Sequence, residues 1–75
     1  MNNTQLRDSE NNMIFVNDRL YSSNAVYIVK FGFYSYEDNE VAYGFYLRDE
    51  QYNTLHPMPY TETGMLKLLN LGRID

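Results

Sequence analysis

The chain has 75 residues, with ten Asp and Glu against six Lys and Arg, no cysteine and one histidine, and its formal net charge is −4. A chain this short folds as one domain with a thin core, and its cysteine and histidine counts exclude disulfides, thiolate zinc sites and imidazole-rich metal cages. The scattered cations and the negative charge argue against direct nucleic-acid binding and favour a protein partner with a basic surface.

Residues 1–12 are polar and include four asparagines. They cannot bury enough apolar surface to offset the entropy of ordering, so we predict a flexible polar N-terminal arm here, or alternatively a segment that orders on a target. A single α+β domain is predicted over residues 13–75. No apolar run approaches the roughly 20 residues of a membrane span and the N-terminus lacks a signal-peptide core, so we expect a cytoplasmic protein.

A first hairpin is predicted at the start of the domain. Residues 13–16 form a short β-rich run, Asn17 and Asp18 suit a tight turn because both tolerate positive φ, and residues 19–21 form a second run. Residues 22–24 (Ser-Ser-Asn) then break the pattern.

The two strongest strand patterns are residues 25–36 and 41–52, which are rich in β-branched and aromatic side chains and flank an acidic turn. They should pair antiparallel, with Tyr36 facing Val41 and each strand glycine facing a phenylalanine. Under this register both faces of the hairpin are apolar, which indicates that each face has a cover.

The C-terminal third provides one predicted cover. Residues 52–60 include two prolines and indicate an ordered connector or an edge strand, whereas residues 61–72 have an N-cap threonine, an apolar stripe and a terminal glycine and predict a helix. The predicted fold class is therefore α+β: a small curled antiparallel sheet of about four strands with one C-terminal helix. One short helix covers only one face, so the other either binds a partner or curls into a tiny barrel filled by the first hairpin.

The sequence contains no pattern typical of a catalytic site. His56 is the sole classical general base, and the serines lie in no nucleophile-elbow or phosphate-loop pattern, so we expect a protein that is not an enzyme and that holds no cofactor and no metal. The acidic clusters at residues 37–40 and 49–50 lack the spacing of a calcium loop. Their functional interpretation is negative charge presented to a basic protein surface.

In size and composition the chain resembles the small acidic inhibitors encoded by phages and other mobile elements, notably anti-CRISPR proteins. That resemblance implies a compact noncatalytic protein that occludes a basic groove on a nuclease, often by imitating the charge of DNA, in the cytoplasm of a bacterial host. The leading hypothesis is an inhibitor of a nucleic-acid-processing protein. Its candidate contacts are five acids and four rings: Glu37, Asp38, Glu40, Asp49, Glu50, Tyr27, Phe31, Phe33 and Tyr46.

Three other functions stay open. A toxin-neutralising or immunity protein would have the same chemistry with a different partner. A structural subunit would form a homodimer through the uncovered sheet face. A small nucleic-acid-binding module is suggested by residues 30–33 and 43–47, which look faintly like the stacking motifs of RNA-recognition and cold-shock domains, but the basic residues of those families are missing.

Overall fold

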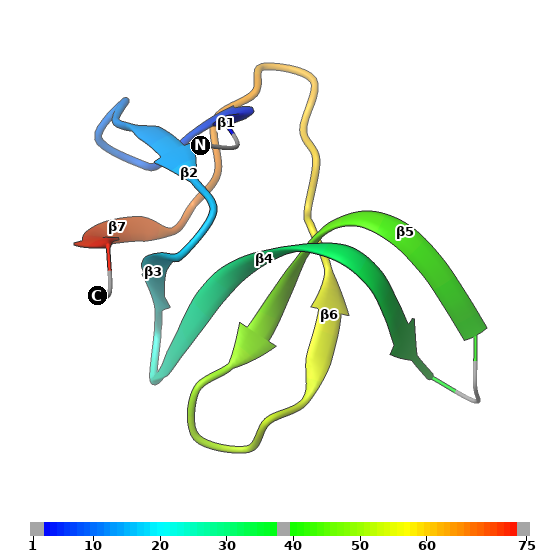
Figure 1. The fold of residues 1–75 in the computed structure, drawn as a ribbon. Helices are drawn as coiled ribbons and strands as arrows, with labels where there is room; N and C mark the ends of the chain where they lie inside the picture. Colours follow the sequence, from blue (N-terminus) through cyan, green and yellow to red (C-terminus); the bar gives the residue numbers. More distant parts are fainter. Residues whose placement is uncertain (1–2, 38–39, 74–75) are drawn as a thin grey trace.

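Seven β-strands run through residues 3–37 and 40–73, the parts of the chain described by the structure, which is a computed structural model. They are β1 (Asn3–Arg7), β2 (Met13–Phe15), β3 (Asp18–Ser22), β4 (Ala25–Tyr36), β5 (Glu40–Asp49), β6 (Leu55–Pro57) and β7 (Leu69–Arg73). A five-stranded antiparallel sheet has the order β6-β5-β4-β3-β7, and β1 pairs with β2 in a separate antiparallel sheet (Figure 1). These residues contain no helix, so the predicted α+β class with a C-terminal helix is wrong.

The segment predicted to be that helix is extended. Gly64 has a φ of 76°, outside the helical region, and the Thr61 hydroxyl donates to the carbonyl oxygen of Met65. Leu66 and Leu68 are buried while Met65 and Lys67 are exposed, which is the two-residue alternation of an extended chain. A short apolar run fits both a helical and an extended period, and here the extended form places two leucines in the core and leads into β7 beside β3.

Residues 3–12 belong to the folded domain and do not form the flexible N-terminal segment that their composition predicts. Residues 3–7 form β1, in which Thr4 and Leu6 are buried. The Asp8 carboxylate is fully buried and accepts hydrogen bonds from the backbone amides of Glu10, Asn12 and Asn70 at 2.9, 2.7 and 2.8 Å. Asp8 therefore ties the N-terminal turn to β7. Residues 1 and 2 lie outside the described residues.

The predicted first hairpin has its turn but not its pairing. Asn17 adopts a φ of 77°, and the Phe15 amide donates to the Asp18 carboxylate at 2.8 Å, so the chain turns where expected. However, β2 pairs with β1, and β3 pairs with β4 and β7. The break at residues 22–24 is confirmed as the turn between β3 and β4, where Ser22 pairs with Ala25.

The central hairpin, β4 and β5, is confirmed, but its register differs by one residue from the prediction. Tyr36 pairs with Glu40 and Gly32 pairs with Gly44, and the Glu40 amide donates to the Glu37 carbonyl at 3.0 Å. Because side chains alternate along a strand, this shift regroups every residue of the hairpin, and odd-numbered residues of both strands now share one face.

The paired glycines bend the hairpin into an arch, which Figure 1 shows in green. Gly32 and Gly44 have φ values of 138° and 145°, a region that residues with a side chain rarely adopt. Tyr34 and Tyr46, which flank the glycine pair on the inner face of the arch, stack with ring centroids 4.6 Å apart. Tyr46 pairs with Lys30, four residues before Tyr34, and a straight strand would advance about 13 Å over four residues. The bend and the lean of both rings therefore bring them together.

The core lies at the base of this hairpin, on the outer face of the arch. Val29 and Leu47 pair there and are buried, and Met58 packs with them. The segment after β6 supplies that methionine, and β6 itself is an edge strand paired with β5, as the prolines predicted. The core cluster comprises Leu6, Ile14, Leu20, Val29, Leu47, Met58, Leu66 and Leu68.

Candidate functional site

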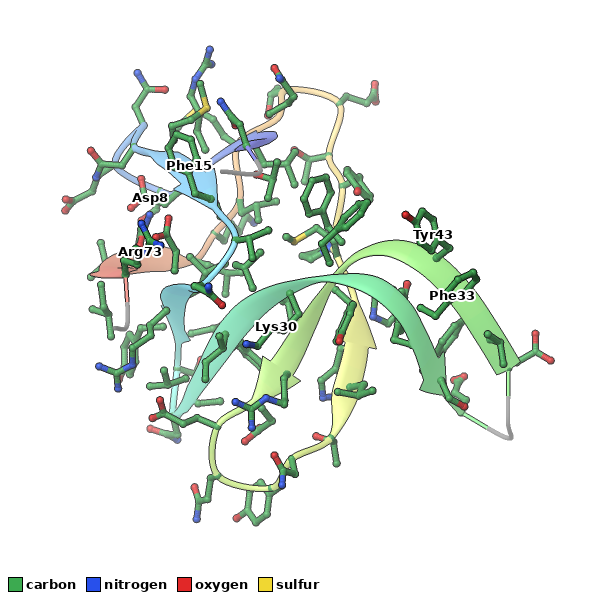
Figure 2. The ribbon with its side chains drawn as sticks, viewed as in Figure 1. Asp8, Phe15, Lys30, Phe33, Tyr43 and Arg73 are labelled. Carbon is green, nitrogen blue, oxygen red and sulfur yellow. The ribbon has the colours of Figure 1, made fainter. Side chains whose placement is uncertain are left out.

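The distal part of the central hairpin projects from the body of the domain (Figure 1). We call residues 31–37 and 40–45 the arm. Its outer face carries four rings in contact: Phe31 lies 4.8 Å from Phe45 and 5.3 Å from Tyr43, and Phe33 lies 4.7 Å from Tyr43, measured between ring centroids. We call Phe31, Phe33, Tyr43 and Phe45 the outer aromatic face. Figure 2 shows Tyr43 on the outer side of the arch and Lys30 beneath it.

The outer aromatic face is exposed to solvent. Phe33 is 76% exposed, Tyr43 63% and Phe31 42%, and Val41 in the next row is exposed as well. One row toward the body, Val29 and Leu47 are buried. The apolar stripe therefore begins in the core and continues onto the arm, where Phe45 is still half-buried against the core but Phe33 and Tyr43 lie mostly in water. Contiguous exposed apolar surface of this kind typically marks an interaction site.

The inner face of the arm is a tyrosine stack. Tyr34 packs against Tyr46 and, at 5.5 Å between ring centroids, against Tyr36. Burial raises the pKa of the Tyr34 phenol, and the nearby phenols of Tyr36 and Tyr60 raise it further. Tyr34, Tyr36 and Tyr46 are each half-buried, so the inner face is more closed than the outer face.

The tip of the arm is acidic. Glu37 and Glu40 are both exposed where β4 ends and β5 begins, and Asp38, the third predicted acid of this turn, lies outside the described residues. The sequence from residue 31 to residue 45 contains three carboxylates and no Lys or Arg. Exposed aromatic rings and unbalanced negative charge thus share one element.

The other predicted acidic pair has structural roles. Asp49 is buried, and its carboxylate accepts hydrogen bonds from the amides of Gln51 and Tyr52 at 2.8 and 3.0 Å, which closes the turn after β5. Glu50 forms an ion pair with Arg19, through two hydrogen bonds of 3.1 and 3.2 Å. Asp49 and Glu50 lie at the opposite end of β5 from the tip, so the structure separates the two acidic clusters.

The four predicted rings are also divided. Phe31 and Phe33 lie together on the outer aromatic face, Tyr46 lies on the inner face, and Tyr27 lies at the other end of β4, edge-on to His56 at 5.7 Å between ring centroids. Sequence reasoning missed Tyr43 and Phe45, because the one-residue register error placed them on the other face of the sheet from Phe31 and Phe33. The observed register, in which Tyr36 pairs with Glu40, groups all four rings on one face.

Residues 3–37 and 40–73 contain no group of three His, Asp or Glu side chains placed to hold a metal ion. The imidazole Nε2 of His56 lies 3.1 Å from the Thr54 hydroxyl. Within the same described residues, no helix is long and apolar enough to cross a membrane.

Comparison of the chain with protein-family models, with curated proteins and with solved structures finds no match. The geometry of the chain is therefore the basis for its functional interpretation. That geometry defines an all-β domain with a projecting arm that is aromatic on its sides and acidic at its tip.

Proposed function

We propose that this protein is a noncatalytic inhibitor that inserts its arm into the nucleic-acid-binding cleft of a nucleic-acid-processing protein, such as a nuclease of a defence system. The observation that carries the proposal is the exposed outer aromatic face beside the acidic tip. A cleft that binds nucleic acid offers cations for phosphates and flat apolar surface for bases. The arm offers carboxylates and rings, which are complementary to both.

The aromatic rings would supply most of the binding free energy. Phe33 and Tyr43 are exposed in the free protein. Burying a large apolar side chain contributes about 1.5–3 kcal/mol, and aromatic residues near the centre of an interface commonly dominate its affinity. The rings already pack on one another, so little side-chain freedom would be lost on binding.

The carboxylates of the tip would act mainly on the rate of association. Charges at the rim of an interface steer the encounter and suppress partners of the same sign. A basic cleft would attract this tip, whereas the protein's net charge of −4 would keep it from nucleic acid itself. The arm thus combines steering with a separate apolar contact.

The test is affinity capture from a bacterial lysate, with identification of the retained protein and an activity assay on it after purification. The wild-type chain should retain a nucleic-acid-processing protein and inhibit it, and the double variant Phe33→Ser/Tyr43→Ser should lose both effects. Tyr52→Ser is the matched control, because it removes an equally exposed ring from outside the arm. Equal capture by the double variant, or a retained protein with no nucleic-acid function, would refute the proposal.

A further inference from the structure

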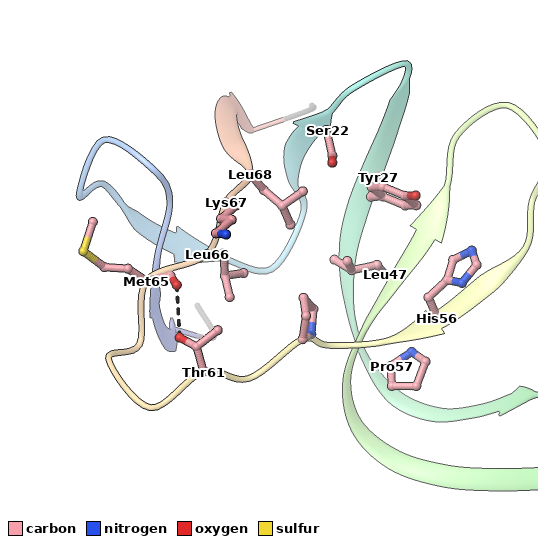
Figure 3. Close-up of a pocket in the computed structure, with 11 residues that line it drawn as sticks. Ser22, Tyr27, Leu47, His56, Pro57, Thr61, Met65, Leu66, Lys67 and Leu68 are labelled. Carbon is pink, nitrogen blue, oxygen red and sulfur yellow. Dashed lines mark hydrogen bonds between the residues drawn. The ribbon is translucent and has the colours of Figure 1, made fainter.

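A second feature lies on the same face of the sheet, at the end remote from the arm. A pocket of about 510 Å³ opens between the β4–β5–β6 sheet and the segment that follows β6 (Figure 3). Tyr27, Leu47 and His56 form the sheet side, and Leu66 and Leu68 form the facing side. This volume is within the range of pockets that bind small organic molecules.

The pocket exists because the chain after β6 covers the sheet only in part. Met58 enters the core beside Val29 and Leu47, and the chain then leaves the sheet and returns at Leu66 and Leu68. An extended segment has one row of inward side chains, so it fills less of the space above the sheet than a helix would. Pro57 and Pro59 line the pocket and fix the backbone at its edge.

The charges around the pocket are opposite to those of the molecule as a whole. None of the Asp and Glu residues that the structure describes lines it, whereas Lys67 does and His56 adds a basic side chain. Lys67 is exposed, and within the described residues its ammonium group forms no ion pair. A lysine stem packs along apolar surface while its charge stays in water, so the ammonium group can reach over the mouth of this pocket.

We infer that the pocket binds a small amphipathic acid, with an alkyl chain or ring against Tyr27, Leu47 and Leu66 and a carboxylate at the mouth beside Lys67. The apolar walls supply affinity through burial, and the lysine selects the anionic head group over a neutral one. This inference does not rest on the proposed function of the arm, because the pocket and the arm share no lining residue.

Octanoate is the probe, and NMR chemical-shift titration of the ¹⁵N-labelled protein is the measurement. We expect saturable shifts centred on Ser22, Tyr27 and His56, which line the pocket from three strands. Ser22→Phe, which places a ring in the pocket, should abolish these shifts in a protein whose spectrum shows that it is folded. Lys67→Gln should weaken octanoate binding about twofold to fivefold, as expected for an exposed ion pair, and leave the binding of 1-octanol unchanged.

Two control variants locate the binding site. Arg73→Gln removes a cation from the far end of β7 and should bind octanoate like the wild type. Phe33→Ser/Tyr43→Ser should also bind normally. The inference is overturned if octanoate produces no saturable shifts at millimolar concentration, if the shifts fall on the arm, or if Lys67→Gln leaves octanoate binding unaltered. The wild-type titration and the Lys67→Gln variant test octanoate binding in the pocket even if Ser22→Phe does not fold.

Discussion

The base and the arm of the central hairpin consist of the same two strands and similar side chains, yet they differ in what covers them. At the base, Val29 and Leu47 are buried in a core cluster that includes Met58. On the arm, two rows further along the strands, Phe33 is 76% exposed and Tyr43 63%. The sequence of a strand therefore determines that a face is apolar, but the rest of the chain determines whether that face is core or surface. The base should govern stability, and the arm should govern binding.

The strongest test of this contrast is truncation of one apolar side chain in each region. Leu47→Ala should lower the free energy of unfolding by about 2–5 kcal/mol, because it removes buried contacts and leaves a cavity. Tyr43→Ala should change it by less than about 0.5 kcal/mol, since its ring is mostly in water. Urea denaturation of both variants measures the difference. Similar losses would mean that the arm contributes to the core.

Substitution of Asp8 tests how the body of the domain outside the central hairpin is stabilised. Asp8→Asn keeps the shape of the side chain but replaces one acceptor oxygen with a donor, so at least one of the three backbone amides loses its partner. We expect a loss of about 1–3 kcal/mol in unfolding free energy, measured at pH 7 in urea. Glu10→Gln is the control, because Glu10 is exposed and its own side chain should contribute little.

The same carboxylate predicts acid sensitivity. Burial raises the pKa of Asp8, but the hydrogen bonds from Asn70, Asn12 and Glu10 outweigh it and leave the pKa below its ordinary value of 3.8. A lowered pKa in the folded state means that Asp8 stabilises the fold fully above the unfolded pKa, and that this contribution is lost as the pH falls through the folded value. Stability curves from pH 6 to pH 2 should therefore fall less steeply for Asp8→Asn than for wild type. Parallel curves would contradict the assigned role.

The elements that were predictable from sequence are those with long local patterns. Residues 25–36 and 41–52 predicted the two central strands because β-branched and aromatic residues persist over ten or more positions, and the prolines near His56 predicted an edge. The C-terminal run was misassigned because its leucines suit both periods, and only contact with the core and with Asp8 favours the extended form. β1 was missed because just one apolar side chain, Leu6, anchors it.

The candidate site was predictable only in part, for a related reason. Composition indicated that some aromatic rings would remain exposed, and the acidic turn was evident in the sequence. Which rings share a face depends on the number of residues in the turn, and a difference of one residue moves Tyr43 from the position opposite Tyr34 to the position opposite Phe33. The pocket could not be foreseen, because it lies where a segment predicted as helix instead crosses the sheet as extended chain.

Substitutions at the bend between the base and the arm should have an effect of intermediate size on the free energy of unfolding. Gly32→Ala and Gly44→Ala each place a side chain at a φ of about 140°, where space is open but the backbone is strained. Each should lower the unfolding free energy by about 1–2 kcal/mol, or relieve the strain by straightening the arch. Straightening would separate Tyr34 from Tyr46, so near-ultraviolet circular dichroism should change. Ala42→Gly, which alters a neighbouring position of ordinary geometry, is the control.

The smallest expected effect on stability comes from the tip, where Glu37→Lys/Glu40→Lys reverses two exposed carboxylates. Neither makes a salt bridge to the described residues, so the unfolding free energy should change by less than about 0.5 kcal/mol. Association with a basic partner should slow, and its rate should lose most of its dependence on ionic strength, because the two substitutions bring the net charge of the chain from −4 to about zero. Dissociation, which we propose the outer aromatic face controls, should change little. Stopped-flow measurement at two salt concentrations gives the association rate and its dependence on ionic strength. An unaltered salt dependence would mean that the aromatic rings alone, and not the carboxylates, recognise the partner.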